Sequence, residues 1–470
     1  MLVKDSLSAK MVEVGEKGKV GLYVCGPTVY GHIHIGNARA PLFWDVVVRY
    51  LRSRGYDVTF VQNITDIEDK IIGKANQEGV SWQEIVRRYT DSFHERLEML
   101  GIRMPDVEPR ATEHIQEMIS LIGELIEKGH AYAPEDANGD VYYAVGSFPH
   151  YGALSHQRPE EMRETEKGQT GFKRSPLDFA LWKASKPGEP SWESPWGPGR
   201  PGWHIECSAM VSKHLPEGAD IHGGGTDIRF PHHENELAQS AAAHPERPFV
   251  RAWAHHGMVT LSSGKMAKSV GNVLDVERAV HLHGRNAVRM WLLQSHYSQP
   301  IEYSEEILEE KRRSYERLMR LYLQISGSQS SSELSDTMAA ELRESVEAAM
   351  YDDLNTPEAL ATLFEVAGRA GREISTRPEA AGEFGSLAEA MEEVMTIFGF
   401  DLAQELSTEV EGVHIRYSEE PDAGVLKSVA ARESARREKD WATADGLRDE
   451  LHADGWAVED TSEGPILSRR

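Results

Sequence analysis

The sequence is poor in cysteine and has no long apolar run. Two cysteines in 470 residues, Cys25 and Cys207, cannot form the disulfide framework of a secreted scaffold. No stretch approaches about 18 apolar residues, so we expect no membrane-spanning helix. The first residues, Met1 to Ser6, lack the apolar core of a secretory signal. These absences predict a cytoplasmic protein with no membrane association.

Basic residues are too few for a generally basic nucleic-acid-binding surface, because 51 Lys and Arg stand against 76 Asp and Glu and the net charge is −25. A local basic stripe can still act within a Debye length of about 8–10 Å. Two segments carry such stripes: Lys311, Arg312, Arg313, Arg317 and Arg320, and then Arg432, Arg436, Arg437 and Lys439. Glutamates are interleaved in both, so an ion-paired, solvated helix face explains each stripe equally well.

The first hundred residues alternate between strand and helix patterns. Residues 20–24 and 58–61 are short apolar runs, whereas 42–54 and 82–100 have helical periodicity. This alternation predicts an α/β fold with a doubly wound parallel sheet, whose ligand site lies beyond the carboxyl ends of the strands. Cys25 falls at such an end.

Later segments divide the chain further. Residues 111–200 interrupt the alternation with a helix, a hairpin-like stretch and a Pro/Gly-rich segment, and the polar run 327–333 reads as a linker. The predicted domains are 1–110 and 201–258 (two halves of a nucleotide-binding domain), 111–200 (an insertion), 259–326, 327–415 (a helical bundle) and 416–470 (a small terminal module).

A glycine-rich segment follows the first strand. Its turns at Gly26-Pro27 and Gly31 to Gly36 lead into a helix that is predicted to begin near Asn37. Strand, turn and helix N-terminus form a phosphate-binding geometry, because free backbone N–H groups and the positive end of the helix dipole face the ligand. His32 and His34 lie in the turn, where an imidazole can meet developing phosphate charge.

A second segment carries two lysines. Lys265 and Lys268 lie three positions apart in a loop flanked by Ser262-Ser-Gly264. Two mobile cations of this kind suit a polyphosphate leaving group, although a solvated surface loop has the same composition.

Together the two segments resemble the HIGH and KMSKS signatures of class I aminoacyl-tRNA synthetases, and four further motifs resemble the cysteinyl-tRNA synthetase family. The motifs are Asn63-Ile-Thr-Asp66, Gly202-Trp-His-Ile-Glu-Cys-Ser-Ala-Met210, Asp220-Ile-His-Gly-Gly-Gly-Thr-Asp227 and Phe230-Pro-His-His-Glu-Asn-Glu236. The resemblance implies a Rossmann-type catalytic domain with a connective insertion, an α-helical bundle and a small anticodon-binding module. Two positions depart from the signatures: Asn37 replaces a histidine and Ala267 a serine.

The resemblance also implies a metal site. His232 and Glu236 are spaced i, i+4 on one helix face, which by itself is more often ordinary packing than ligation. The family's zinc positions fall on Cys25, Cys207, His232 and Glu236. A hydrophobic pocket separates cysteine from serine by only about 1–3 kcal/mol, whereas zinc binds a thiolate strongly and an alcohol poorly. One Zn²⁺ per subunit is expected, with Glu236 bound loosely enough for the substrate sulfur to enter.

The implied reaction is activation of L-cysteine by ATP with Mg²⁺, followed by transfer to the terminal adenosine of tRNA(Cys) by a monomeric enzyme. Residues of the first signature would bind phosphate, and Lys265 and Lys268 would stabilise pyrophosphate. Gly223, Gly224 and Asp227 would approach adenosine, and Thr65, Trp203 and His222 would form the amino-acid pocket. The phosphate-binding set comprises His32, His34, Gly36 and Asn37.

Alternatives remain for the carboxyl-terminal module and for the function. Residues 436–451 read as one amphipathic helix, and Trp441 and Trp456 either stack on unpaired bases or pack the core of the module. The nearest alternative function is the cysteine ligase of mycothiol synthesis, which lacks the anticodon module. A catalytically inactive RNA-binding or zinc-storing protein would have no use for both phosphate signatures.

Overall fold

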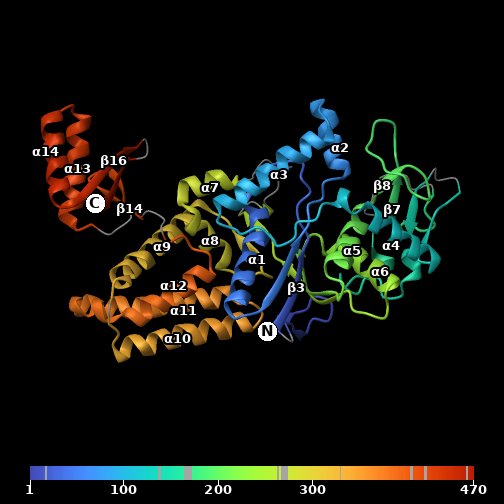
Figure 1. Cartoon of the computed structure of the whole chain (residues 1–470), viewed down its shortest axis with the longest axis horizontal. Helices are drawn as coiled ribbons and strands as arrows, with labels where there is room; N and C mark the ends of the chain where they lie inside the picture. The colour runs from blue at the N-terminus through green and yellow to red at the C-terminus, as the bar shows by residue number, and fades with distance from the viewer. Residues whose placement is uncertain are drawn as a thin grey trace. The chain divides into compact units, whose positions relative to one another are not determined.

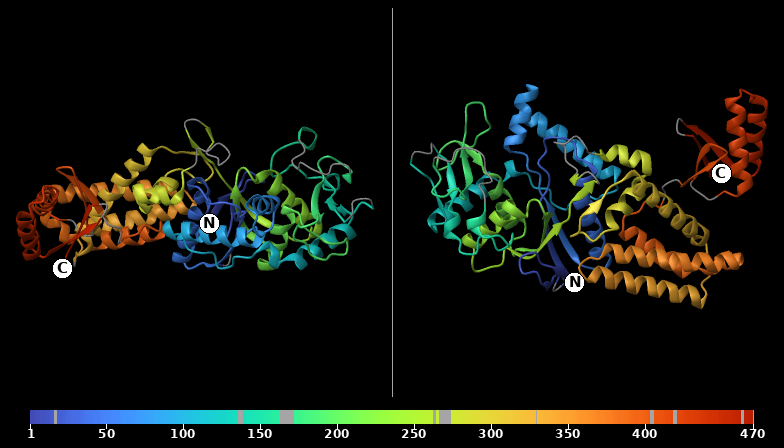
Figure 2. Two further views of the ribbon diagram at one scale, coloured as in Figure 1. Left: turned by 90° about the horizontal axis from the view of Figure 1, so that it is seen from above. Right: turned by 180° about the vertical axis from the view of Figure 1, so that it is seen from behind.

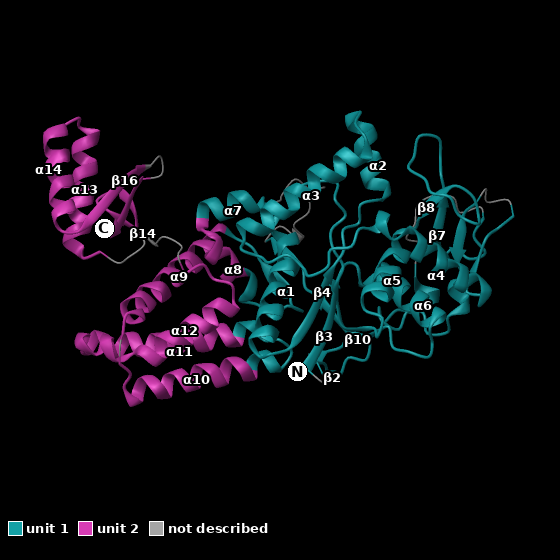
Figure 3. Cartoon of the chain, viewed as in Figure 1, with its two compact units in different colours: residues 1–282, 292–304, 349–357 teal, residues 283–291, 305–348, 358–470 magenta. Residues whose placement is uncertain are grey.

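The computed structural model describes residues 1–15, 18–135, 139–162, 172–261, 264–265, 274–328, 330–402, 406–417, 421–461 and 464–469. It divides into two compact units (Figure 3). Unit 1 comprises residues 1–282, 292–304 and 349–357, and unit 2 comprises 283–291, 305–348 and 358–470. No helix in the described part of the chain is long and apolar enough to cross a membrane.

A four-stranded parallel sheet forms the centre of unit 1, in the order β10-β9-β3-β4 (Figure 1). Its strands are β3 (Lys19–Val24), β4 (Asp57–Gln62), β9 (Ala219–Gly225) and β10 (Val250–His256). All three strand pairs are parallel, so the four carboxyl ends share one edge. The predicted doubly wound sheet is confirmed.

Helix α1 (Ile35–Ser53) connects β3 to β4 and buries Leu42, Val46, Val47 and Leu51 on its inner face. The helical pattern predicted over residues 42–54 therefore covers the later part of α1. The helix begins at Ile35, two residues before the predicted start at Asn37. After β4 the chain forms α2 (Asp69–Glu78) and α3 (Trp82–Met99). Ser81 caps α3, because its side chain accepts a hydrogen bond from the Glu84 N–H.

The insertion contains its own antiparallel sheet beside three helices (Figure 2). The strands β5 (Ala131–Tyr132), β6 (Val141–Tyr143), β7 (Phe179–Ala184) and β8 (Gly199–Pro201) lie in that order. Helices α4 (Ile115–Glu127), α5 (Trp203–His214) and α6 (Glu234–Ala243) pack with it around a shared apolar core. The predicted hairpin at 139–145 is therefore the middle of a four-stranded sheet. Two helical turns, Ala111–Glu113 and Arg229–His233, precede α4 and α6.

Shorter elements complete unit 1. An N-terminal hairpin, β1 (Leu2–Lys4) and β2 (Met11–Glu13), precedes the sheet, and a small sheet has the order β12-β11-β13. Its strands are β11 (Val259–Leu261), β12 (Gly264–Lys265) and β13 (Ile301–Glu302). Most of helix α7 (Val276–His283) follows in unit 1, whereas most of α8 (Arg285–Leu293) belongs to unit 2.

Unit 2 holds a helical bundle and a terminal α/β module. The bundle helices are α9 (Glu305–Ser326), α10 (Glu333–Tyr351), α11 (Thr356–Thr376) and α12 (Gly385–Ile397). The module has a sheet in the order β14-β15-β17-β16 and two helices, α13 (Ala423–Arg437) and α14 (Trp441–Ala453). Its strands are Leu406–Val410, Val413–Tyr417, Trp456–Thr461 and Gly464–Arg469 in chain order, from β14 to β17.

The prediction of one helix over 436–451 is wrong. The chain breaks between α13 and α14 at Lys439, whose φ of 62° cannot continue a right-handed helix. The two tryptophans separate the alternatives for this module. Trp456 is buried in the core beneath the guanidinium of Arg469, 4.3 Å from the ring centre, whereas Trp441 is 57% exposed.

Both basic stripes contain ion pairs. In the first, Arg312 contacts Glu309 at 2.6 Å and Glu316 at 2.5 Å. In the second, Arg432 and Arg436 both contact Asp460, at 2.8 and 2.5 Å. For these three arginines, the contacts favour the interpretation as an ion-paired helix face over that as a nucleic-acid-binding stripe.

Candidate active site

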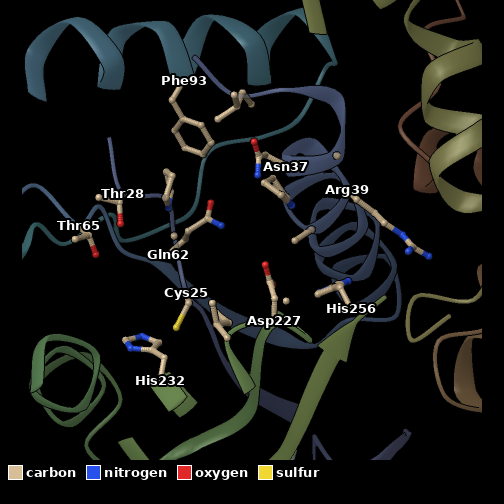
Figure 4. A pocket seen from close by; sticks show the side chains of 18 of the residues that line it. Cys25, Thr28, Asn37, Arg39, Gln62, Thr65, Phe93, Asp227, His232 and His256 are labelled. Carbon is tan, nitrogen blue, oxygen red and sulfur yellow. The ribbon is translucent and has the colours of Figure 1, made fainter. Parts of the chain in front are cut away.

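A cavity of about 550 Å³ lies at the carboxyl ends of the central strands (Figure 4). Three strands contribute through the loop that follows them, with Cys25 after β3, Thr65 after β4 and Asp227 after β9, and β10 contributes its last residue, His256. The N-terminal turns of α1 form another wall through Asn37. This is the edge at which a doubly wound sheet binds its ligands.

The first signature forms the N-terminus of α1. His34 precedes the helix, and its backbone N–H donates to the side-chain oxygen of Asn37 at 3.2 Å, while the Asn37 N–H donates to the His34 carbonyl at 2.8 Å. His34 is therefore the N-cap residue of α1, and the Asn37 side chain accepts from its backbone N–H as in a capping box. Gly36 lets the His34 ring pack closely beside it, because a Cβ there would lie 3.0 Å from that ring.

His32 lines an adjoining hollow instead of the main cavity. The hollow has a volume of about 600 Å³, and His34 and Tyr30 line both spaces. The His32 ring nitrogen Nδ1 lies 2.5 Å from the Ser92 hydroxyl of α3. The structure thus brings both histidines of the signature to the same end of α1.

The four predicted metal ligands lie together: three of them, Cys25, Cys207 and His232, line the cavity, and Glu236 is buried beside them. One ligand atom from each of Cys25, Cys207, His232 and Glu236 lies within 4.8 Å of the other three. The Cys25 Sγ is 3.7 Å from the Cys207 Sγ and 3.6 Å from Glu236 Oε1, which is 3.0 Å from His232 Nε2. The ligands come from the end of β3, from α5, from the turn before α6 and from α6 itself. Figure 4 shows the Cys25 sulfur directed toward the His232 ring.

Burial and proximity perturb these groups strongly. Burial raises the pKa of the Cys25 thiol well above its ordinary value. Burial also opposes ionisation of Cys207, but the hydrogen bond with Cys25 and the contact with His232 together lower the pKa of Cys207 to about 7. Burial likewise disfavours a charged His232, yet Glu236 and Cys207 together raise its pKa to about 10. The cluster therefore holds protons that a bound metal ion would displace.

A second quartet overlaps the first and was not predicted as a ligand set. Cys25 and Glu236 also group with His222 and His233 within the same 4.8 Å limit. The His233 Nε2 lies 3.3 Å from the Cys25 Sγ, and its Nδ1 lies 2.9 Å from His255 Nε2. The sequence contained a signal for His233, because it follows His232 directly.

The predicted amino-acid pocket residues divide between the cavity and the core. Trp203 lines the cavity and stacks on His232, with ring centres 4.2 Å apart and planes 13° apart. Thr65 also lines it, and its hydroxyl donates to the buried carboxyl of Glu206 at 3.1 Å. His222 does not line the cavity but lies behind Cys25, at 3.5 Å from its sulfur. Burial raises the pKa of Glu206 well above its ordinary value.

Three of the remaining predicted residues are placed by β9 and the loop after it. Gly223 and Gly224 are buried and leave room for the rings of Trp44 and His233, since an added Cβ would lie 2.5 and 2.4 Å from those side chains. Asp227, by contrast, lines the cavity. Lys265 has its backbone in β12, and Lys268 lies outside the described residues.

Arg39 was missed by the sequence reasoning. It is buried in α1 and donates to the carbonyl of Gly257 at 2.7 Å and to that of His296 at 3.1 Å. Burial lowers its pKa to about 10. These bonds fasten α1 to the chain that enters β11, so Arg39 fixes the two walls of the cavity relative to each other.

The chain matches three family models in succession. Residues 11–313 match the class I (C) tRNA synthetase catalytic domain, residues 345–403 match the DALR domain, and residues 422–464 match the cysteinyl-tRNA ligase anticodon-binding domain. A cysteine–tRNA ligase from Rubrobacter xylanophilus is 72% identical over 469 residues, covering 100% of this chain and 99% of the relative. The chain belongs to the cysteine–tRNA ligase family.

A more distant cysteine–tRNA ligase and a solved tRNA synthetase structure also resemble this chain. The cysteine–tRNA ligase from Thermodesulfovibrio yellowstonii is 42% identical over 483 residues and is covered to 99%, as is this chain. Methionyl-tRNA synthetase from Mycobacterium tuberculosis superposes with a TM-score of 0.62 at 18% identity, over 81% of this chain and 90% of that one. The predicted family, fold class and enzyme class are thus confirmed, and the match at 422–464 favours the synthetase over the mycothiol-type ligase.

Proposed function

We propose that this chain activates L-cysteine with ATP and transfers the cysteinyl group to the terminal adenosine of tRNA(Cys). The observation that carries the proposal is one cavity whose wall includes both the N-terminus of α1 and three members, Cys25, Cys207 and His232, of the cluster completed by Glu236. A helix N-terminus suits phosphate, and a thiol-rich cluster suits a metal that recognises sulfur.

The cluster fits a zinc ion by its donor set. Two thiols, an imidazole nitrogen and a carboxylate are zinc ligands, and all four groups gather within 4.8 Å. Glu236 Oε2 is also buried without a hydrogen-bond partner in the described part of the chain, a costly state that a cation would relieve. His204 Nδ1 lies 3.1 Å from His232 Nδ1 and leaves Nε2 directed at Glu236. When bound, zinc supplies a position that accepts the substrate thiolate and holds an alcohol poorly.

In the first step the cysteine carboxylate attacks the α-phosphate of ATP, and pyrophosphate leaves with its Mg²⁺. The backbone N–H of Gly36 and the side-chain amide N–H of Asn37, with His34 and His32, would stabilise the phosphate charge by position alone. Lys265 and Lys268 would stabilise the departing pyrophosphate.

In the second step a ribose hydroxyl of the tRNA attacks the carbonyl carbon of the adenylate, and AMP leaves. We assign the contact with the adenosine ribose to Asp227, since it lines the cavity at the end of β9. Thr65 and Trp203 would bound the amino acid. Gly223 and Gly224 would act through packing behind the adenosine, with His222 supporting Cys25.

The function is tested by cysteine-dependent ATP–pyrophosphate exchange followed by charging of tRNA(Cys), with serine as the competing amino acid. We expect exchange with cysteine, none with serine, and acylated tRNA. Exchange without charging would contradict the transfer step, and no exchange in zinc-loaded protein would contradict the activation step.

The metal assignment has its own test, because the two quartets differ in His232 and His233. Zinc content per chain is measured for His232→Gln and for His233→Gln after dialysis against the same chelator. We expect His232→Gln to lose the metal and His233→Gln to retain it. The reverse result would assign the ion to the other quartet.

A further inference from the structure

A buried arginine outside the cavity contacts a serine that holds His32 of the first signature and two acidic residues that follow the lysine loop. Arg96 lies in the last turn of α3, and its side chain is 8% exposed. Its Nη1 donates to the Ser92 hydroxyl at 2.8 Å and to the Ser92 carbonyl at 3.3 Å. Its Nη2 lies 3.5 Å from Asp275 Oδ2 and 3.8 Å from Glu277 Oε2. One guanidinium therefore joins α3 to the segment that begins α7.

The Ser92 contact leads to the first signature. Although His32 is exposed, two groups of α3 hold its ring: the Ser92 Oγ at 2.5 Å from Nδ1, and Tyr89, edge-on at 5.2 Å. A guanidinium can only donate, so the Ser92 oxygen accepts from Arg96 and keeps its own proton available for a second bond. With that proton directed to Nδ1 of His32, 2.5 Å away, the neutral imidazole carries its proton on Nε2, and an N–H donor is what a phosphate oxygen requires.

The Asp275 contact leads to the second signature. Asp275 follows the lysine loop and pairs as an antiparallel bridge with His34. The Ile35 N–H, at the start of α1, donates to the Leu274 carbonyl at 3.0 Å. The hollow beside the main cavity is lined by His32, His34 and Asp275 together. Arg96 thus lies behind a wall that both segments share.

We propose that Arg96 is a positioning residue of the ATP site. Through Ser92 it fixes the ring and tautomer of His32, and through Asp275 it anchors the chain that leaves the lysine loop. The proposal rests on the proposed function, because it concerns the same adenylation step. Arg96 acts on ATP and not on cysteine, since its contacts all lie on the phosphate side of α1.

The test compares Arg96→Ala with Arg87→Ala in the full-length, zinc-loaded chain. Arg87 is a matched control on the solvent face of the same helix, where it pairs with Glu84 at 3.0 Å and Asp91 at 3.4 Å. Initial rates of pyrophosphate exchange give kcat and the KM for ATP and for cysteine. We expect Arg96→Ala to lose about tenfold in kcat/KM for ATP, with the KM for cysteine unchanged and Arg87→Ala behaving as the wild type.

Conservative variants separate positioning from folding. Arg96→Lys keeps the charge but cannot reach both partners, so it should recover about a third of the loss. Ser92→Ala should raise the KM for ATP even if Arg96→Ala fails to fold, whereas Ser92→Thr, which retains the hydroxyl, should not. Equal kinetics for Arg96→Ala and Arg87→Ala, or equal rises in both KM values, would overturn the proposal. Absence of exchange in the wild type would instead overturn the proposed function.

Discussion

Gly223 provides a test of how the central sheet supports the site. It lies in β9, between Val24 of β3 and Ala254 of β10. A Cβ at this position would lie 2.5, 2.6 and 2.7 Å from Cζ2, Cε2 and Nε1 of Trp44, whose side chain is fully buried in α1. Neighbouring strands on both sides prevent β9 from moving away. We therefore predict that Gly223→Ala destabilises unit 1 and disturbs the cavity.

The magnitude follows from the overlap. Ordinary contact begins at 3.4 Å, so the indole or the strand must shift by roughly 1 Å. Overpacking of this kind costs about 1–3 kcal/mol, and we expect the upper end because the ring is rigid and enclosed. At roughly 2 °C per kcal/mol for a unit of this size, the apparent melting temperature should fall by about 4–6 °C. Exchange activity should fall as well, because the Gly223 carbonyl accepts from the Cys25 N–H at 3.1 Å.

Thermal unfolding followed by tryptophan fluorescence measures the effect. Gly73→Ala in α2 is the matched control, since nothing lies within 4 Å of the added methyl, and it should stabilise the helix slightly. Trp44→Phe removes the three overlapping atoms, so the double variant with Gly223→Ala should be more stable than the sum of the single effects. A wild-type melting temperature for Gly223→Ala, or simple additivity with Trp44→Phe, would refute the reasoning.

Two further predictions concern other parts of the chain. The hydrogen bond to Glu108, at 3.0 Å, raises the pKa of His94, so its stabilisation is complete below the unfolded pKa of about 6.5 and disappears as the pH rises through the folded pKa. The difference in melting temperature between wild type and His94→Gln should therefore be larger at about pH 5.5 than at about pH 8.5, and a constant difference would contradict it. In unit 2, the buried Arg289 donates from Nε and Nη2 to the Phe398 carbonyl at 3.0 and 2.8 Å. Arg289→Met should lower stability to urea by roughly 2–4 kcal/mol, and an unchanged midpoint would exclude this role.

Local patterns carried much of the fold prediction. The apolar runs of β3 and β4 and the periodicity of α3 lie within one or two residues of the observed limits. The strands are short, nearly continuous buried apolar runs and the helix has one buried face, so local sequence is enough to find them. The four predicted metal ligands come together because the family motifs carry long-range information that spacing lacks.

Pairing between segments far apart in the sequence could not be predicted from local patterns. β15 pairs with β17, about fifty residues further along, and no local pattern encodes that partner. The role of Gly224 was likewise hidden, since the ring it accommodates belongs to His233. In the sequence Arg96 is one of several charged residues of a helix. Its contacts are seen only in the structure, where α3 packs against the loop that holds His32 and the segment that holds Asp275.

The most direct test of the account is pyrophosphate exchange measured together with zinc content as the metal is removed and returned. The Cys25–Cys207–His232–Glu236 cluster predicts one zinc ion per chain, cysteine-dependent exchange that disappears on chelation, and recovery in proportion to the zinc restored. Full exchange in metal-free protein, with cysteine still preferred over serine, would contradict the central claim that this cluster selects the substrate thiol.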